Sequence, residues 1–346
     1  MTVLPPKIPI RNLYYLLCYA WNHLEQGALV DISRDSSISV ADLFAKLLCD
    51  GVEHISRRGM QQGYEQREEE LAGLRGRIDL IGSARRLLLE HGRANCTFDE
   101  LSVDTHANRL IKATLKVLSG AAEDDAIRKR VRALHTRLRE IGEVRLSKQM
   151  FRSVQISSNE RFYRFLIHIC EFVFSSCLVD SRTGTSKFRD FLRDERAMAR
   201  VFEDFLLNFL KHELKTWNAS RENIRWDAAS DTDGSLSLLP RMRTDVILRS
   251  GERCRIADAK YYSASTSNYY ETEKIHAANL YQLMSYVSNA SAAEPYAEIA
   301  GILIYPRVDR TLRERYRIQG HVIEVCTVDL SADWREIHSE LLSLFQ

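Results

Sequence analysis

Along much of the 346-residue chain, apolar residues recur at intervals of three and four, interrupted by short apolar runs. The first pattern indicates helices that face a core, and short runs bounded by turn residues indicate strands. In the first half these patterns predict an α+β arrangement, with a polar run at residues 64–70. The predicted helices cover residues 13–20, 40–48 with a continuation through 55 to 57–59, 106–118 (capped by Thr105) and 126–141, and the predicted strands cover 71–79 and 97–101.

The second half of the chain predicts an α/β fold. Its order of elements, with helices before, between and after several strands, favours a central mixed sheet flanked by helices. The predicted helices cover residues 162–178, 195–214, 273–287 and 334–345, and the strands cover 223–227, 245–249, 253–258, 300–305 and 322–328.

The length of the chain allows two domains, each with its own core. The most linker-like segment is residues 154–160, Val-Gln-Ile-Ser-Ser-Asn-Glu. We therefore predict an N-terminal α+β domain over residues 1–155 and a C-terminal α/β domain over residues 156–346.

Composition and charge are ordinary for a soluble globular protein, with 45% hydrophobic and 28% charged residues. The net charge of +2 neither supports nor excludes a polyanionic partner. Seven scattered cysteines without a Cys-x-x-Cys pair are typical of reduced cytosolic thiols. The start of the chain shows no signal pattern, and the most apolar helix, residues 165–178, is interrupted by His168 and Glu171. These features predict a cytoplasmic protein without a membrane partner.

The predicted hairpin over residues 245–258 is where candidate chemistry first appears. Two short strands flank a turn that contains Gly251, the usual residue type where a turn needs a positive φ. If the hairpin closes near Ser250 and Gly251, Asp245 lies opposite roughly Ile256 or Ala257. The Asp245 carboxylate then comes close to the end of the second strand.

The second strand ends in Asp258-Ala259-Lys260. Residues two apart in a strand share a face, so Asp258 and Lys260 are expected to point the same way, near Asp245. Two carboxylates can bind Mg²⁺ and leave positions for water and a phosphate oxygen, while the lysine orients the water and offsets charge on the phosphate. This arrangement predicts a site for phosphodiester hydrolysis.

The alternative is an ordinary surface hairpin with an ion pair, because an acidic residue two positions before a lysine is a common pattern. Glu213-Leu214-Lys215 also matches it. That match lies in a predicted helix, where residues two apart do not face each other, and it has no upstream strand that carries an aspartate.

Two basic clusters, Arg75 with Arg77 and Arg85 with Arg86, follow the polar run in the first half. Contact with phosphate or with a partner is one interpretation, and solvated surface charge is the one that the pattern favours.

The order of elements, together with Asp245 and Asp258-Ala259-Lys260, resembles the PD-(D/E)XK nuclease core. Several separated segments also resemble the McrC family, the endonuclease subunits of McrBC modification-dependent restriction systems, and this similarity spans essentially the whole chain. The segments are Ile8-Pro-Ile-Arg-Asn-Leu-Tyr-Tyr, Leu238-Leu-Pro-Arg-Met-Arg-Thr-Asp, Asp258-Ala-Lys-Tyr-Tyr and Asn279-Leu-Tyr-Gln-Leu-Met.

The resemblance implies a DNA endonuclease subunit that uses Mg²⁺ within a GTP-dependent restriction complex acting on double-stranded DNA with modified cytosine. It implies that the N-terminal part binds and stimulates an McrB-like AAA+ GTPase hexamer, which binds GTP and recognises the modified base. The chain itself has no Gly-x-x-x-x-Gly-Lys-Ser/Thr loop, in agreement with GTP binding and hydrolysis by another chain. Two alternatives stay open: a GTPase-activating subunit with a vestigial nuclease site, and a stand-alone repair-type nuclease.

Residue by residue, the resemblance implies that Asp245 and Asp258 are catalytic metal ligands and that Lys260 is the catalytic lysine. Thr244 stands where the name of the superfamily places a proline, a residue that shapes the backbone and carries no chemistry.

The resemblance also implies roles for residues on two helices. Glu203 corresponds to a helical acid that some members place beside the metal; the alternative is an exposed helix residue. Gln282 and Tyr286 fit positions that some members use to contact the scissile phosphate; the alternative is packing at the edge of the sheet. The four arginines, Arg75, Arg77, Arg85 and Arg86, are candidates for DNA or partner contact on charge alone.

Overall fold

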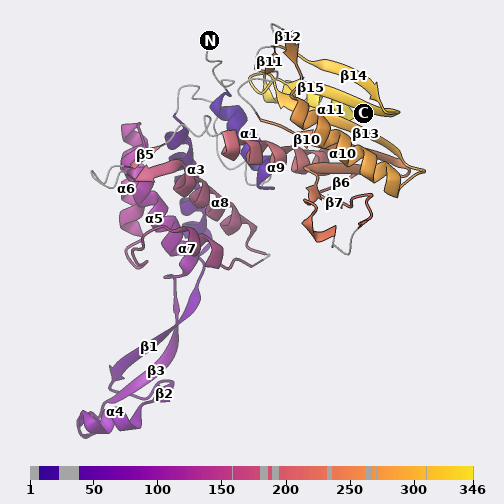
Figure 1. Ribbon diagram of the computed structural model, residues 1–346. Helices are drawn as coiled ribbons and strands as arrows, with labels where there is room; N and C mark the ends of the chain where they lie inside the picture. The colour runs from indigo at the N-terminus through magenta and orange to yellow at the C-terminus, as the bar shows by residue number, and fades with distance from the viewer. Residues whose placement is uncertain are drawn as a thin grey trace. The chain divides into compact units, whose positions relative to one another are not determined.

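The computed structural model describes residues 8–22, 39–157, 159–179, 186–188, 195–231, 236–261, 267–269, 272–308 and 310–345. The chain forms two compact units. We call residues 1–38 with 190–346 the sheet unit, and residues 39–189 the arm unit (Figure 1).

This division differs from the predicted boundary at 155/156. The N-terminal helix α1 (Ile10–Ala20) packs along α9 (Glu195–Glu213), with the ring of Tyr19 5.7 Å from Phe205 and 5.3 Å from Phe209. Helix α8 (Arg161–Ser176) packs instead on the helices of the arm unit. The aromatic faces of α1 and α8 therefore decide the division, and the linker-like composition of residues 154–160 does not.

The sheet unit contains a mixed sheet, as predicted, and its six strands lie in the order β14-β15-β13-β10-β9-β6. Strands β10, β13 and β15 are parallel, and the remaining neighbours are antiparallel. Their bounds are β6 Asn218–Ser220, β9 Val246–Ser250, β10 Arg253–Ala259, β13 Glu298–Pro306, β14 Arg313–Ile318 and β15 His321–Val328.

Helices cover both faces of this sheet. Helix α10 (Ala277–Ala293) contributes Leu283 and Val287 to a buried cluster that includes Ile256 of β10. On the opposite face, the Arg255 Nη1 donates a hydrogen bond to the main-chain oxygen of Leu344 in α11 (Trp334–Phe345), at 3.1 Å. The contacts of α9 with β10 and β9 complete a layered α/β unit.

Two edge strands, β6 and β14, were not predicted. The predicted strand over residues 223–227 shortens to β7 (Asn223–Ile224), which pairs with β8 (Met242–Arg243) outside the main sheet. Residues 313–318 of β14 are mostly exposed, so they lack the buried alternation that reveals a strand. The remaining elements of the sheet unit are η3 (Leu236–Leu238) and the short strand pair of β11 (Ser267–Tyr269) with β12 (Thr272–Lys274). A second short pair, β4 (Cys177–Val179) with β5 (Ser186–Phe188), belongs to the arm unit.

The arm unit is built on a group of helices: α3 (Val40–Arg58), α5 (His106–Ala121), α6 (Asp125–Arg137), α7 (Lys148–Ser153) and α8. The predicted cap of α5 is confirmed, because Thr105 Oγ1 accepts a hydrogen bond from the Asn108 N–H at 3.3 Å. Rings of Phe44 and Phe172, 4.6 Å apart, join α3 to α8. None of the helices in the described part of the chain is long and apolar enough to cross a membrane.

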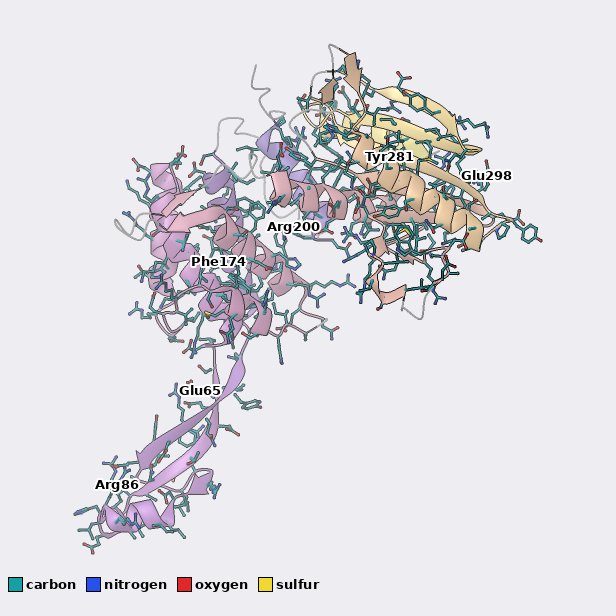
Figure 2. The ribbon with its side chains drawn as sticks, viewed as in Figure 1. Glu65, Arg86, Phe174, Arg200, Tyr281 and Glu298 are labelled. Carbon is teal, nitrogen blue, oxygen red and sulfur yellow. The ribbon has the colours of Figure 1, made fainter. Side chains whose placement is uncertain are left out.

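A long two-stranded ribbon, which we call the arm, leaves these helices (Figure 1). Strand β1 (Gly63–Leu71) pairs antiparallel with β3 (Ala94–Ser102) along nine residue pairs. The segment between them, residues 72–93, forms the tip, which holds β2 (Arg77–Ile78), α4 (Leu80–Arg85) and η1 (Leu89–His91). Arg86 lies at this outer end, and Glu65 lies near the helices (Figure 2).

The strand predicted over residues 97–101 is confirmed as part of β3, whereas the strand predicted over 71–79 is reduced to residues 77–78. The polar run over residues 64–70 is itself strand β1. Its side chains are exposed on both faces of the ribbon, so no alternation of apolar and polar residues marks it as a strand.

Candidate active site

The hairpin of β9 and β10 brings the two predicted catalytic aspartates together. Ser250 pairs with Arg253, and Val246 pairs with Ala257, so Asp245 lies level with Asp258 just beyond the last pair. The predicted partners of Asp245, Ile256 or Ala257, were wrong because the turn falls one residue later than expected. Its two residues are Gly251 and Glu252, and Gly251 has a φ of 59°, in the left-handed region that favours glycine.

Asp258 and Lys260 share a face of the strand, as predicted. Lys260 Nζ lies 2.8 Å from Asp258 Oδ2, and the side chains are only 16% and 1% exposed. The Lys260 N–H donates to the main-chain oxygen of Ile304 at 2.9 Å, which continues the parallel pairing of β10 with β13. The lysine is therefore held on a paired backbone in the interior of the sheet.

The Asp245 carboxylate meets the same short segment from the neighbouring strand. Its Oδ2 accepts a hydrogen bond from the Ala259 N–H at 3.0 Å. Burial raises the pKa of the Asp258 carboxyl above its ordinary value; the nearby Lys260 ammonium opposes this shift, and the Asp245 charge adds to it. Two acids and one ammonium thus interact in a site in which Asp258 is buried and the other two side chains are partly exposed.

The arrangement fits a bound cation. Asp258 Oδ1 is buried and has no hydrogen-bond partner among the described residues, a state that costs free energy in a protein interior. Carboxylate oxygens are the ligands that Mg²⁺ prefers, and Mg²⁺ commonly keeps several waters beside one or two protein carboxylates. In the described part of the chain, no three His, Cys, Asp or Glu side chains converge as a ready metal cluster. The carboxylates of Asp245 and Asp258 fit the chemistry of Mg²⁺, and their role as its ligands stays a prediction.

Glu203 comes from α9 and is half-buried beside this pair. Burial, and secondarily the Asp245 charge, raises the pKa of Glu203 from 4.5 to about 7. Its carboxyl group is thus within electrostatic range of Asp245 without forming a three-carboxylate cluster. A role for Glu203 as a metal ligand stays a prediction.

The raised pKa of Glu203 has a consequence for stability. Because the folded protein holds this proton more tightly than the unfolded chain, stability is lost as pH rises from the ordinary pKa through about 7. Glutamine mimics the neutral acid, so Glu203→Gln should melt roughly 2–4 °C above the wild type at alkaline pH, with little difference near pH 5. Thermal melts in EDTA measure this effect.

The matched control is Glu252→Gln, at an exposed turn of the same unit. It should melt like the wild type at both pH values. Equal melting of Glu203→Gln and the wild type across the range would show that Glu203 is ionised without cost.

Gln282 and Tyr286 lie one helical turn apart on α10. Gln282 Nε2 donates to Tyr286 Oη at 2.7 Å, and Tyr286 Oη donates to the main-chain oxygen of Arg243 at 3.1 Å. Burial raises the pKa of Tyr286, and the charges of Asp258, Lys260 and Asp245 also act on it. The structure thus places Tyr286 within electrostatic range of the carboxylate pair and Gln282 beside Tyr286, while their contact with phosphate stays a prediction.

Thr244 donates a main-chain hydrogen bond that a proline, which has no backbone N–H, could not form. Its N–H donates to the Glu222 main-chain oxygen at 3.0 Å, and its Oγ1 accepts from the Glu222 N–H at 3.1 Å. A proline at this position could not donate the first bond. The departure from the superfamily pattern therefore fixes the backbone before Asp245 in another way. Sequence patterns missed Glu222 because it follows the short edge strand β6.

The four predicted arginines, Arg75, Arg77, Arg85 and Arg86, belong to the arm unit and lie in its tip. The Arg75 guanidinium lies 4.0 Å from the centroid of the Phe98 ring and 3.6 Å from Glu100. Arg86 lies 3.3 Å from Glu70. These contacts neither require nor exclude DNA or partner binding.

Comparisons with known proteins agree with the resemblance noted in the sequence. Residues 6–306 match the model of a family described as McrBC 5-methylcytosine restriction system component. The chain is 39% identical over 341 residues to a protein of Escherichia coli K12, the type IV methyl-directed restriction enzyme EcoKMcrBC, covering 98% of both.

Among solved structures, the fold resembles a chain in the Thermococcus gammatolerans assembly of McrB AAA+ hexamers with bound McrC. The TM-score is 0.61 at 16% identity, over 97% of this chain and 76% of that one. The structural likeness concerns the fold, and the family match covers most of the sequence. The chain therefore belongs to the family of McrBC 5-methylcytosine restriction system components.

Proposed function

We propose that this chain is the endonuclease subunit of a GTP-dependent complex that cuts double-stranded DNA containing modified cytosine. The observation that carries this proposal is the joining of the buried Asp258 with the partly buried Asp245 and Lys260 in a member of the McrBC family. The hairpin that holds this site, in a mixed sheet covered by helices, supports the assignment of a PD-(D/E)XK core.

Asp245 and Asp258 would hold Mg²⁺, which when bound acts as a Lewis acid on phosphate and lowers the pKa of water. The low exposure of Asp258 excludes bulk water from one side of the pair. Lys260, held 2.8 Å from Asp258, can donate a hydrogen bond to the attacking water and offset negative charge on the phosphate. Gln282 and Tyr286 would orient a phosphate oxygen from α10.

We assign the arm to contact with an AAA+ GTPase hexamer of the McrB type, which would bind GTP and recognise the modified base. The Escherichia coli relative is named a methyl-directed enzyme, and the similar Thermococcus gammatolerans chain belongs to an assembly of McrB AAA+ hexamers with bound McrC. The paired strands of the arm carry mostly acidic charge, which repels DNA phosphates. The acidic residues are Glu65, Glu68, Glu69, Glu70, Asp99 and Glu100.

The tip adds a surface suited to protein contact. Several large apolar side chains there are exposed, and clusters of exposed apolar residues mark interaction sites. They are Leu74 (76% exposed), Leu80 (61%), Ile81 (69%), Leu87 (56%) and Leu89 (49%). With acidic strands behind this surface, the tip arginines are better placed to bind a protein than a duplex.

The experiment that tests this function compares Lys260→Ala with Lys215→Ala in a complex reconstituted with the GTPase partner, GTP, Mg²⁺ and cytosine-methylated DNA. We expect Lys260→Ala to lower the cleavage rate roughly 10²–10⁴-fold, because the group that acts on the water is lost. GTPase stimulation should stay at the wild-type level.

Lys215→Ala is the matched control because it removes an exposed lysine from the other Glu/Asp-x-Lys pattern, in the turn that follows α9. It should cut like the wild type. Normal cleavage by Lys260→Ala would remove Lys260 from the mechanism.

A further inference from the structure

Arg221 connects the backbone at Asp245, just before β9, to α9. It follows β6, and its Nε donates a hydrogen bond to the main-chain oxygen of Asp245 at 3.2 Å. Its Nη2 lies 2.8 Å from Asp204 Oδ1 on α9, and the Arg221 side chain is 24% exposed. One guanidinium therefore joins two elements that approach the site from different directions.

The position of Asp245 depends on such contacts because the regular strand pairing stops short of it. Strand β9 begins at Val246, where it pairs with Ala257, and β6 pairs with β9 no further than Ser220 with Ile247. The backbone of Asp245 therefore lies outside the ladder on both sides.

Beyond the end of the ladder, residues 221 and 222 form the hydrogen bonds to the backbone of residues 244 and 245. Glu222 exchanges main-chain and hydroxyl hydrogen bonds with Thr244, which is only 1% exposed. The carboxylate of Glu222 lies 3.1 Å from Arg249 Nη2, and Arg249 Nη1 lies 2.7 Å from Glu294 at the end of α10. The segment that carries Arg221 is thereby fixed to both helical layers.

We propose that Arg221 is a positioning residue that holds Asp245 in the geometry needed for metal binding, an inference that rests on the proposed nuclease function. Asp204 is the neighbour of Glu203, so the same guanidinium fixes the position of the Glu203 segment of α9 relative to the backbone of Asp245. A variant without Arg221 still has every acidic residue of the site, but the positions of these residues relative to one another are less tightly fixed.

Arginine suits this role better than lysine. Its planar guanidinium offers donors in separate directions, so Nε and Nη2 reach a carbonyl and a carboxylate at once. A lysine carries its donors on one atom and would keep the charge near Asp204 while losing the reach to Asp245. Arg221→Lys should therefore fall between the wild type and Arg221→Ala.

The test measures two properties of Arg221→Ala, Arg221→Lys and Asp204→Asn. The first is Mn²⁺ binding to the full-length chain by calorimetry, without DNA or nucleotide. The second is the Mg²⁺ concentration for half-maximal cleavage in the complete complex. Outer residues that orient ligands typically account for about 10–100-fold in metal affinity, so we expect a weakening in this range for Arg221→Ala and a smaller one for the other two.

A purely structural role would lower the melting temperature of Arg221→Ala without changing the metal dependence of the folded protein. Arg225→Ala, at an exposed arginine four residues along, is the control and should bind Mn²⁺ like the wild type. If Arg221→Ala does not fold, Arg221→Lys and Asp204→Asn carry the same comparison.

Two outcomes distinguish this inference from the function on which it rests. Wild-type Mn²⁺ affinity in all three variants, with binding abolished by Asp258→Asn, overturns the role of Arg221 and leaves the nuclease site intact. If the wild type shows no specific Mn²⁺ binding and Asp258→Asn gives the same calorimetric result as the wild type, the metal site itself is overturned.

Discussion

Asp258→Asn should abolish DNA cleavage while leaving GTPase stimulation intact. Asparagine keeps the shape of the side chain but removes the charge that would hold the cation, in a site where Asp258 is 1% exposed. Loss of a group on which the chemical step depends costs roughly a thousandfold or more in rate, and we expect at least that loss here. The measurement is single-turnover cleavage of methylated DNA in the reconstituted complex, beside GTP turnover.

The exposed Asp227 of the same unit offers a matched control, because Asp227→Asn makes the same chemical change away from the site. It should cut at the wild-type rate. If Asp258→Asn abolishes both cleavage and GTPase stimulation, the variant no longer assembles with the partner, and the result says nothing about the chemical step. If the wild type never cuts but raises GTP turnover, the chain is a regulatory subunit whose nuclease site is vestigial.

Removal of the arm tip should abolish GTPase stimulation and leave the metal site of the chain intact. Leu71 and Ala94 are a paired position at the end of the ladder, so residues 72–93 can be replaced by Asn-Gly, a two-residue turn that closes hairpins. The shortened ribbon keeps its nine pairs but loses the exposed apolar surface. We expect GTPase stimulation and association with the hexamer to be lost, with Mn²⁺ binding unchanged.

A quadruple variant, with Arg75, Arg77, Arg85 and Arg86 changed to Ala, then separates charge from apolar contact within the tip. Association with the partner should weaken while binding of DNA by the isolated chain stays the same, because the acidic strands already repel DNA. Full stimulation by the chain that lacks the tip would assign partner contact to another surface.

The sequence predicted which residues of the site lie together better than it predicted the architecture around them. Asp258 and Lys260 share a face because alternation along a strand is local, so spacing alone predicted a contact that the structure gives as 2.8 Å. The partner of Asp245 was misjudged because a shift of one residue in a turn moves the register of the whole hairpin. The family resemblance then supplied Gln282 and Tyr286, whose mutual hydrogen bond follows from their spacing of four residues on a helix.

The features that sequence patterns missed depend on long-range packing or on exposed structure. The arm has no buried alternation to reveal β1, since both faces of the ribbon are exposed. The place of α1 depends on its aromatic contacts with α9, nearly two hundred positions away along the chain. Arg221 was missed because its two partners, Asp204 and Asp245, meet only in the folded unit.

The most direct test of the central claim is cleavage of a cytosine-methylated duplex by the complete complex, with Mg²⁺ present or replaced by EDTA. The wild-type chain would be compared with the double variant Asp245→Asn/Asp258→Asn. We predict products only for the wild type with Mg²⁺, GTP and partner all present, and none for the double variant at any Mg²⁺ concentration. Equal cleavage by the double variant and the wild type would contradict the assignment of the nuclease site to this chain.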